Sequence, residues 1–290
     1  MSWRTVVITH SAKLDYQMGF LVVRGMEIHK IHLSEIQTLI LASTSVSLTV
    51  ALLSEMTKQK IKVIFCDEKA NPLSELLPYY GSHDTSVKIR KQMDWLDETK
   101  KIIWTEIASE KIRQQAKLLE VFDRPEYKML HGYVAEMQLG DATNREGHAA
   151  KVYFNALFGM EFTRTAENSL NAALNYGYAI ILACFNREIV ANGYLTQIGL
   201  FHDNMFNPFN LGSDLMEPFR PVVDRWVKEN MPCKFEHEEK VQLLALLQKE
   251  VIIAGRKEIL SNAINIYVKS VLDAINDNDS SLMKFYKDEL

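Results

Sequence analysis

The sequence predicts an α+β protein in which a small N-terminal β-rich domain, residues 1–80, precedes a larger all-α helical-bundle domain, residues 81–290. Short β-branched runs fill the first part of the chain. Longer segments with the apolar spacing of helices fill the second part. A length of 290 residues is also close to the limit for one hydrophobic core, which favours two domains.

Four apolar runs in the first part are typical of strands, and one longer segment favours a helix. The predicted strands are 5–8, 19–23, 30–33 and 62–66. Arg24-Gly25 suits a hairpin turn between two of them. Residues 46–58 have a mixed apolar pattern, but their leucine and alanine content favours a helix. Pro72, Pro78 and residues 79–82 then interrupt the pattern, which places the domain boundary near residue 80.

Seven long segments with helical periodicity follow this boundary. They are 86–120, 125–138, 144–158, 167–192, 213–229, 236–252 and 257–276. In the first segment, Ile103, Ile107 and Ile112 continue one apolar stripe that we expect to lie in the core. Trp95 and Trp104 stand among these apolar residues, so core packing is favoured over stacking on bases.

Composition excludes several classes of protein. Asp and Glu outnumber Lys and Arg by 37 to 33, so contact with phosphate requires a local basic patch. Three cysteines without CxxC spacing indicate neither a disulfide framework nor a zinc ribbon, and they fit a reducing cytoplasm. No Gly-rich phosphate loop is present, and no apolar stretch is long enough to predict a signal peptide or a membrane span.

The first candidate site is the start of the predicted helix 144–158. Thr143 and Glu146 have the spacing of a capping box, in which the acid reaches back to the N-cap amide. Alternatively, Glu146 faces the bundle interior as a metal ligand, three and seven residues before Ala149 and Tyr153 on the same helix. On the motif alone, the cap is favoured.

The second candidate site is a loop and the helix predicted after it. His202 lies in a polar and aromatic loop, and Asp214 and Glu217 follow with the i, i+3 spacing of one helix face. These side chains could bind one cation. The alternative is structural, because Ser213 and Asp214 could cap a helix that begins at Leu215, and a lone histidine is more often hydrogen-bonded than metal-bound.

The two candidate sites together favour a metal. One imidazole with carboxylates from separate parts of a helical bundle is a mostly oxygen donor set, which suits Mn²⁺ or Mg²⁺ better than structural zinc. Such an ion polarises a phosphodiester and stabilises the charge that develops on the leaving oxygen. The residues therefore indicate chemistry on phosphate.

Three segments carry a resemblance to a known family. They are Asn144-Arg145-Glu146-Gly147-His148-Ala149-Ala150 with Tyr153-Phe154, Gly199-Leu200-Phe201-His202, and Asp214-Leu215-Met216-Glu217-Pro218-Phe219-Arg220-Pro221. In combination, over nearly the whole chain, they resemble CRISPR-associated protein one, the integrase and endonuclease subunit of CRISPR adaptation. The first segment and residues 3–7 are most similar to members from type II single-effector systems, in particular II-A.

The resemblance implies a metal-dependent DNA endonuclease and integrase that inserts captured fragments as new spacers into a CRISPR array. It implies that Glu146, His202 and Glu217 are the catalytic residues and the ligands of Mg²⁺ or Mn²⁺. In that reaction the 3'-hydroxyl of captured DNA attacks a repeat phosphodiester. The family often has aspartate at the last ligand, so Asp214 could share that role with Glu217 or replace it, although Glu217 is favoured.

The same resemblance implies the partners. These are double-stranded DNA, as captured fragment and as leader-repeat, a second copy of the chain bound through the β-rich dimerisation domain, and the second CRISPR adaptation protein. No membrane association and a cytoplasmic bacterial location are expected. Arg145, Lys151 and Arg220 lie near the motifs and could contact DNA phosphates, although each is more typical of a helix-surface charge.

Two other functions are compatible with these residues. A metal-dependent phosphodiesterase would use the same three ligands with water as the nucleophile, and it would leave cut ends where an integrase leaves a branched strand. A non-catalytic DNA-binding subunit would use the acids only to cap helices.

Overall fold

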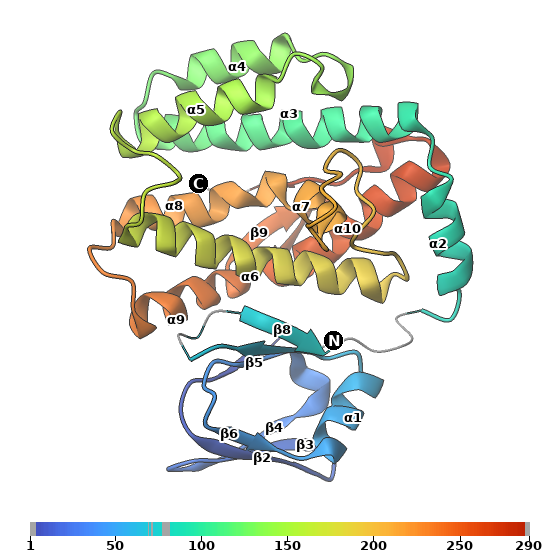
Figure 1. Cartoon of the computed structure of the whole chain (residues 1–290), viewed down its shortest axis with the longest axis vertical. Helices are drawn as coiled ribbons and strands as arrows, with labels where there is room; N and C mark the ends of the chain where they lie inside the picture. Colours follow the sequence, from blue (N-terminus) through green and yellow to red (C-terminus); the bar gives the residue numbers. More distant parts are fainter. Residues whose placement is uncertain (1–3, 69, 71, 77–81, 288–290) are drawn as a thin grey trace. The chain divides into compact units, whose positions relative to one another are not determined.

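A computed structural model describes residues 4–68, 70, 72–76 and 82–287. The chain divides into two compact units, residues 1–83 and 84–290 (Figure 1). The first unit is rich in strands and the second is mainly helical, which confirms the predicted α+β class. Trp3 and the boundary predicted near residue 80 lie outside the described residues.

The first unit contains two four-stranded sheets. One has the order β1-β5-β7-β8, formed by Arg4–Ile8, Ile36–Leu41, Lys62–Cys66 and Pro72–Leu76, with β8 antiparallel to β7 and the other pairs parallel. The second has the order β4-β3-β2-β6, formed by Ile28–His32, Phe20–Arg24, Ala12–Gln17 and Val46–Leu48. In this sheet β2 and β6 are parallel and the other pairs are antiparallel.

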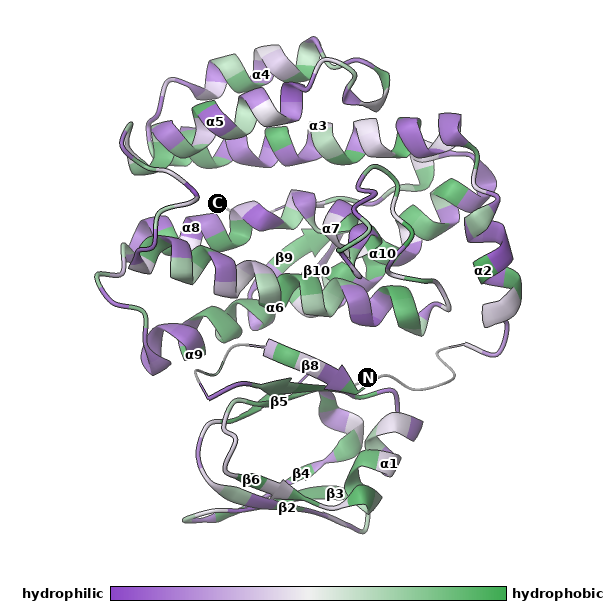
Figure 2. Ribbon diagram, viewed as in Figure 1, coloured by the Kyte–Doolittle hydropathy of each residue, from purple (hydrophilic) through white to green (hydrophobic). Residues whose placement is uncertain are grey.

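Both sheets and helix α1, Val50–Lys58, share one apolar core. Leu39 of β5, Leu21 of β3 and Leu52 of α1 are fully buried and belong to the same cluster. Figure 2 shows hydrophobic residues along β5 and α1. Because apolar burial contributes about 25 cal/mol per Å², this shared core is the main force that holds the two sheets together.

Strands β2 and β5 are not among the four predicted strands, and two further differences lie in residues 46–76. Residues 46–58 form β6 before α1, because the Thr49 hydroxyl accepts a hydrogen bond from the Leu52 amide at 3.3 Å and caps the helix only there. Pro72 begins strand β8, which was not predicted. Its missing N–H is tolerated because it is the first residue of a strand at the sheet edge.

The second unit is built mainly from helices. They are α2 (Thr85–Met93), α3 (Asp97–Val121), α4 (Tyr127–Ala135), α5 (Arg145–Phe158), α6 (Ser169–Ala191), α7 (Asn210–Leu215), α8 (Arg220–Asn230), α9 (His237–Ala245) and α10 (Leu260–Asp277). Helix α3 packs against α4 and α5, and α6 packs against α8 and α10 (Figure 1). Trp95 and Trp104 are buried, which confirms their predicted packing in the core. Within the described part of the chain, no helix combines the length and hydropathy that crossing a membrane requires.

The second unit is not all-α, because the end of the predicted helix 236–252 is a strand. Helix α9 ends at Ala245, and β9 (Glu250–Ile253) pairs with β10 (Arg256–Ile259) and with β11 (Tyr286–Lys287) in an antiparallel sheet. Ala254 and Gly255 make the hairpin turn with φ angles of 51° and 74°. The predicted helix 257–276 therefore begins three residues later, at Leu260.

Two other predicted helices are interrupted. Residues 86–120 divide into α2 and α3. Residues 213–229 divide near Pro218, where α7 has ended and the short 3-10 helix η3, Glu217–Phe219, precedes α8. Proline has no N–H to donate and is tolerated in the first turn of a helix, so it separates two helical segments here.

Candidate active site

Three segments of the second unit bring two glutamates onto one lysine. Glu146 lies in the first turn of α5, and Glu217 begins η3. Both carboxylates form ion pairs with the ammonium group of Lys111 in α3. Lys111 and Glu217 are buried, whereas the Glu146 side chain is 24% exposed. Acids from two separate sequence segments therefore meet at one cation.

Burial and ion pairing act in opposite directions on this acid-lysine cluster. Burial acts to raise the pKa of Glu217, but Lys111 and Arg220 outweigh it and hold that pKa below its usual value. The Arg220 guanidinium lies 2.9 Å from the second oxygen of the Glu217 carboxylate. Burial acts to lower the pKa of Lys111, and the two glutamates outweigh it, so its pKa is raised. The cluster thus consists of charged groups that stabilise one another.

The start of α5 does not form the capping box that the sequence suggests. Asn144 is the N-cap, and its side-chain oxygen accepts a hydrogen bond from an amide of the first turn at 3.3 Å. Asp141 accepts from two further amides there, including that of Glu146 at 3.0 Å. The pairing of Thr143 with Glu146 is therefore wrong. Because other acceptors satisfy these amides, the Glu146 carboxylate is available to Lys111.

The imidazole of His202 is held by Asp214. Its Nδ1 atom lies 2.5 Å from Oδ1 of Asp214, and the same carboxylate accepts hydrogen bonds from the amides of residues 200–202 at 2.6 to 3.1 Å. Asp214 is fully buried inside α7, so it does not cap a helix that begins at Leu215, and that alternative is wrong. The hydrogen bond to Asp214 raises the pKa of His202, against the opposing effect of burial.

Buried amides fix the loop that carries His202. Gln92 of α2 makes three hydrogen bonds with the backbone of residues 195–198, at 2.8 to 3.0 Å. Asn210 donates to two further carbonyls of this loop at 3.0 and 3.1 Å. A Cβ atom on Gly199 would lie 2.4 Å from the carbonyl oxygen of His202. The loop is therefore closely packed where it approaches the histidine.

Aromatic rings cover one side of His202. Trp104 of α3 stacks on Phe201 with ring centroids 4.5 Å apart, and it meets the His202 ring edge-on at 5.9 Å. Trp104 is buried, whereas Phe201 is 52% exposed. The tryptophan that the sequence assigns to the core therefore also shapes the surroundings of the histidine.

A second buried polar group lies further along the same helices. Asp224 of α8 accepts hydrogen bonds from the hydroxyl groups of Tyr153 in α5, at 2.8 Å, and Tyr178 in α6. Burial raises the pKa of Asp224 to about 6, although both hydrogen bonds act to lower it. The Arg220 guanidinium lies 4.8 Å from the centre of the Tyr178 ring, so this group adjoins the acid-lysine cluster.

Sequence reasoning missed Lys111 and Asp224. Each interrupts a run of buried helical positions, between Ala108 and Ile112 in α3 and between Val223 and Trp226 in α8. A charge on a buried helix face is rare unless it is paired. That pattern is a usable signal, although it does not identify the partner.

The three predicted site residues lie in one region, with Lys111 between two of them. Glu217 and His202 influence each other electrostatically, and Asp214 uses its oxygens on the loop and the imidazole. Across the described ranges, no three His, Cys, Asp or Glu side chains are grouped around a point that could hold a metal ion. The donor types nevertheless fit Mn²⁺ or Mg²⁺, and the Lys111 ammonium shows that the space between Glu146 and Glu217 suits a cation.

These features define an α+β protein whose mainly helical unit holds two acids, a lysine and a carboxylate-bound histidine. The family model described as CRISPR associated protein Cas1 matches residues 5–251, and this chain belongs to that family. The CRISPR-associated endonuclease Cas1 of Neisseria meningitidis serogroup C (strain 8013) is 32% identical over 291 residues, which cover 98% of this chain and 96% of the relative. A relative from Francisella tularensis subsp. novicida (strain U112), with a similar name, is 24% identical and covers 87% of this chain and 89% of its own length.

Solved structures share the fold. A casposase bound to integration product has a TM-score of 0.76 at 18% identity, covering 97% of this chain and 93% of that chain. A chain of a Cas6-RT-Cas1–Cas2 complex has a TM-score of 0.75 at 17% identity, covering 99% of this chain and 36% of that chain. A Cas1 protein from Thermotoga maritima has a TM-score of 0.57 at 16% identity, covering 95% and 97%.

Proposed function

We propose that this chain is a metal-dependent DNA endonuclease and integrase of CRISPR adaptation, in which Glu146, His202 and Glu217 hold Mg²⁺ or Mn²⁺. The observation that carries the proposal is the convergence of the two glutamates on one buried cation, with the Asp214-bound imidazole of His202 in the same region. Membership of the Cas1 family and a relative named as an endonuclease support nuclease activity. The casposase with its integration product supports strand joining.

A divalent ion at this site supplies a Lewis acid that polarises a phosphodiester and neutralises charge on the leaving oxygen. Asp214 accepts the Nδ1–H of His202, which orients the ring and would leave Nε2 to hold the ion. Arg220 adds positive charge beside Glu217. No protein nucleophile is needed. The 3'-hydroxyl of captured DNA forms a new bond to phosphorus, and the bond from phosphorus to the 3'-oxygen of the repeat strand breaks.

The proposed partners extend the same function. A neighbouring fold occurs in a Cas6-RT-Cas1–Cas2 complex, which supports Cas2 as the second adaptation protein. Dimerisation through the β-rich unit and a bacterial cytoplasmic location are proposals that rest on the resemblance to the family over the whole chain. The II-A subtype is a proposal that rests on residues 3–7 and 144–150. Among the basic side chains near the motifs, Lys151 is exposed and suited to contact DNA, whereas Arg145 and Arg220 already pair with acidic side chains.

A strand-joining assay tests this function. The wild type, His202→Ala and Glu146→Gln are compared on a labelled leader-repeat duplex with short donor DNA, Mn²⁺ and Cas2. We expect a branched product from the wild type and its loss in both variants, because glutamine keeps the shape of Glu146 but removes an anionic ligand. Asp203→Asn, at an exposed acid next to His202, is the matched control and should join strands normally.

The products also separate the alternatives. Cut ends without a branched strand from the wild type would indicate a phosphodiesterase that uses water. DNA binding without either product would indicate a non-catalytic subunit. Equal strand joining by the wild type and His202→Ala would show that the metal ligands are misassigned.

A further inference from the structure

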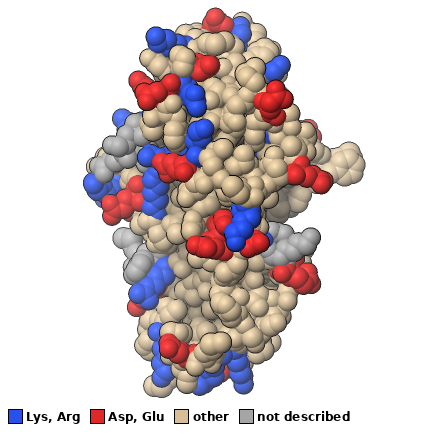
Figure 3. All heavy atoms as spheres, turned by 90° about the vertical axis from the view of Figure 1, so that its left-hand side faces the viewer, with Lys and Arg blue, Asp and Glu red and all other residues tan. Residues whose placement is uncertain are grey.

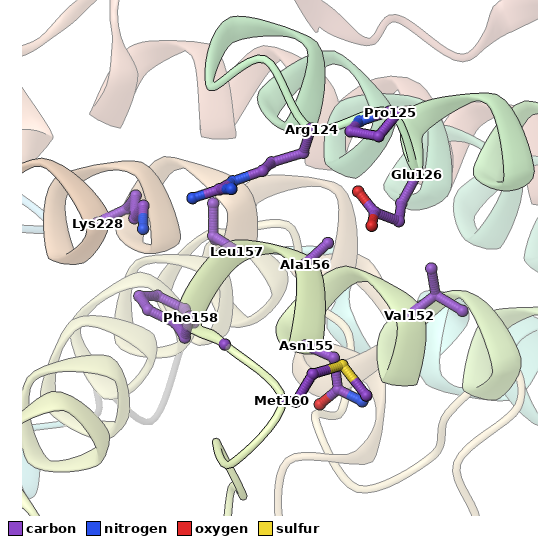
Figure 4. A pocket seen from close by; sticks show the side chains of 11 residues that line it. Arg124, Pro125, Glu126, Val152, Asn155, Ala156, Leu157, Phe158, Met160 and Lys228 are labelled. Atoms are coloured by element: carbon purple, nitrogen blue, oxygen red, sulfur yellow. The ribbon is translucent and has the colours of Figure 1, made fainter.

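Helices α5 and α8 are connected at three places, which follow in the same order along both helices. Near their starts, Glu146 and Arg220 both belong to the acid-lysine cluster around Glu217. Further along, Tyr153 of α5 donates to Asp224 of α8 at 2.8 Å. At their C-terminal ends, both helices line a pocket of about 470 Å³ (Figure 4). The pocket and the cluster therefore lie at opposite ends of one helix pair.

Four polar side chains line this pocket. They are Arg124 after α3, Glu126 at the start of α4, Asn155 of α5 and Lys228 of α8. Among the residues described, none of these side chains has a hydrogen-bond or ion-pair partner, and one carboxylate oxygen of Glu126 is buried. Buried polar groups in folded proteins are nearly always paired. The buried and unpaired carboxylate oxygen of Glu126, in a pocket that also holds the partly exposed Lys228 and the exposed Arg124, therefore indicates a polar ligand.

Two of these side chains are bases that approach each other. In Figure 4 the guanidinium of Arg124 extends toward Lys228, while the Glu126 carboxylate lies on the other side of Arg124. Burial and the positive charge of Arg124 both lower the pKa of Lys228. Because two like charges without an acid between them repel each other, an anion between them would stabilise both.

The rest of the pocket wall is largely apolar and includes the ring of Phe158. The volume falls within the range of about 300 to 1,000 Å³ that is typical of small-ligand sites. A ligand that fits has an anionic group at one end, a hydrogen-bond donor for the buried carboxylate at the other, and a flat apolar body between them. A nucleotide has this chemistry, and its base can stack on an aromatic ring.

Positive and negative side chains are mixed on one face of the molecule. Figure 3 looks onto the left-hand side of Figure 1, and Lys and Arg there are interspersed with Asp and Glu. On the described residues of this face, no broad field of one sign is visible. Contact with phosphate on this face therefore depends on small local groups of Lys and Arg side chains.

We propose that this pocket binds one nucleotide of a single-stranded part of the DNA, with its phosphate between Arg124 and Lys228 and an amino-bearing base against Glu126 and Asn155. The inference rests on the proposed function, because it locates part of the DNA substrate. Asn155 lies nine residues after Glu146 in α5, about 14 Å at 1.5 Å per residue.

DNA binding in metal-free buffer tests the phosphate half of the proposal. Fluorescence anisotropy measures the affinity of labelled short oligo(dC) and oligo(dT) for the full chain. The double variant Arg124→Gln with Lys228→Gln should weaken both by about tenfold and reduce the slope of log affinity against log salt by about one. Lys269→Gln, which removes an exposed positive charge on α10, is the matched control and should change neither quantity. Thermal melting verifies that each variant is folded.

Glu126→Ala tests the base half. Carboxylates accept from the exocyclic amine of cytosine, which thymine lacks, so the wild type should prefer oligo(dC) and the variant should lose that preference. Stronger binding of both oligonucleotides by the variant would show a site for phosphate alone and overturn the base contact. Displacement of oligo(dC) by equal concentrations of free deoxycytidine monophosphate would overturn the assignment to a DNA strand.

Wild-type affinity in the double variant would overturn the inference as a whole. The proposed function would still hold if the wild type joins strands, because the binding assay contains no metal and does not depend on catalysis. Failure of the wild type to join strands, with pocket-dependent binding intact, would instead reject the proposed function.

Discussion

Asp214 binds His202 at two points, because its Oδ1 atom lies 2.5 Å from Nδ1 of the ring and 3.1 Å from the backbone amide of the same residue. The other carboxylate oxygen accepts the amides of Leu200 and Phe201. Glu217, three residues later, instead pairs with the buried ammonium of Lys111. Asp214 and Glu217 are three residues apart in the sequence, but their surroundings differ. Asp214 orients the histidine, whereas Glu217 faces a cation.

Replacing Asp214 with asparagine tests its role as a positioning residue. Asparagine keeps the shape but removes the charge and places an amide donor among groups that already donate. Loss of such a partner of a metal-binding histidine typically reduces metal affinity or activity by about 10- to 100-fold. We expect losses in this range in Mn²⁺ affinity, measured by calorimetry, and in strand joining.

Asp203→Asn makes the same chemical change at an exposed position beside His202 and should leave both quantities unchanged. If Asp214→Asn melts normally and binds Mn²⁺ as tightly as the wild type does, the hydrogen bond to the ring does not position a ligand.

Replacing Lys111 with glutamine removes the positive charge between two carboxylates. Breaking a buried ion pair by removing one partner costs about 3 to 5 kcal/mol, so the metal-free variant should melt well below the wild type. Mn²⁺ should then raise its melting temperature more than that of the wild type, because the ion no longer competes with an ammonium for Glu146 and Glu217. Thermal melts over a Mn²⁺ titration measure both effects.

Lys269→Gln, an equal charge change on the exposed face of α10, should show neither effect. If Lys111→Gln and the wild type respond identically to Mn²⁺, the space between the two glutamates is not where a divalent ion binds.

Asp224 should give the unfolding free energy a pH dependence. Its pKa is about 6 in the folded protein, above the ordinary value of 3.8, so between these two pH values the folded state holds a proton that the unfolded chain has lost. The contribution of Asp224 to stability is therefore greatest below pH 3.8 and falls by about 3 kcal/mol as the pH rises to 6. Asp224→Asn removes this dependence.

Urea unfolding at a series of pH values measures the effect. The stability of Asp224→Asn minus that of the wild type should increase as the pH rises through the window. Tyr153→Phe removes one donor to the carboxylate and should enlarge the pH dependence of the otherwise wild-type protein. A difference that stays flat from pH 3.8 to 6 would contradict burial as the cause of the raised pKa.

The sequence predictions were accurate where residues close together in the chain determine the structure, and they failed where residues distant in the chain determine it. The helix predicted over 144–158 is observed at Arg145–Phe158, where Asn144 supplies the cap and Gly159 ends the segment. The strand predicted over 62–66 is β7. The β9–β10 hairpin was missed because Val251 and Ile252 extend a leucine-rich helical pattern, and pairing with the distant β11 stabilises a strand there.

The candidate site shows the same limit. Glu146, His202 and Glu217 could be selected as acid and imidazole candidates from their segments, but the contacts between them depend on the packing of α3, α5 and η3. Lys111 precedes Glu146 by 35 residues, and no periodic pattern relates the two. The three residues could therefore be selected from the sequence by their side-chain types. The role of each one depends on the three-dimensional arrangement.

Gly199 offers a steric test of the loop that carries His202. A Cβ atom there would lie 2.4 Å from the carbonyl oxygen of His202 and 2.7 Å from Oδ2 of Asp214. Because that carboxylate is held by three backbone amides and the ring, it cannot move without losing hydrogen bonds. Gly199→Ala should therefore destabilise the fold by about 1 to 3 kcal/mol, the usual range for overpacking, and it should reduce strand joining even at temperatures where the variant stays folded.

Gly132→Ala is the matched control, because a Cβ on this α4 residue meets no atom within 4 Å. Helix propensity there predicts a gain of about 1 kcal/mol, so the two glycine variants should shift the melting temperature in opposite directions. If Gly199→Ala melts and joins strands normally, the loop has room for a methyl group beside Asp214 and is not closely packed there.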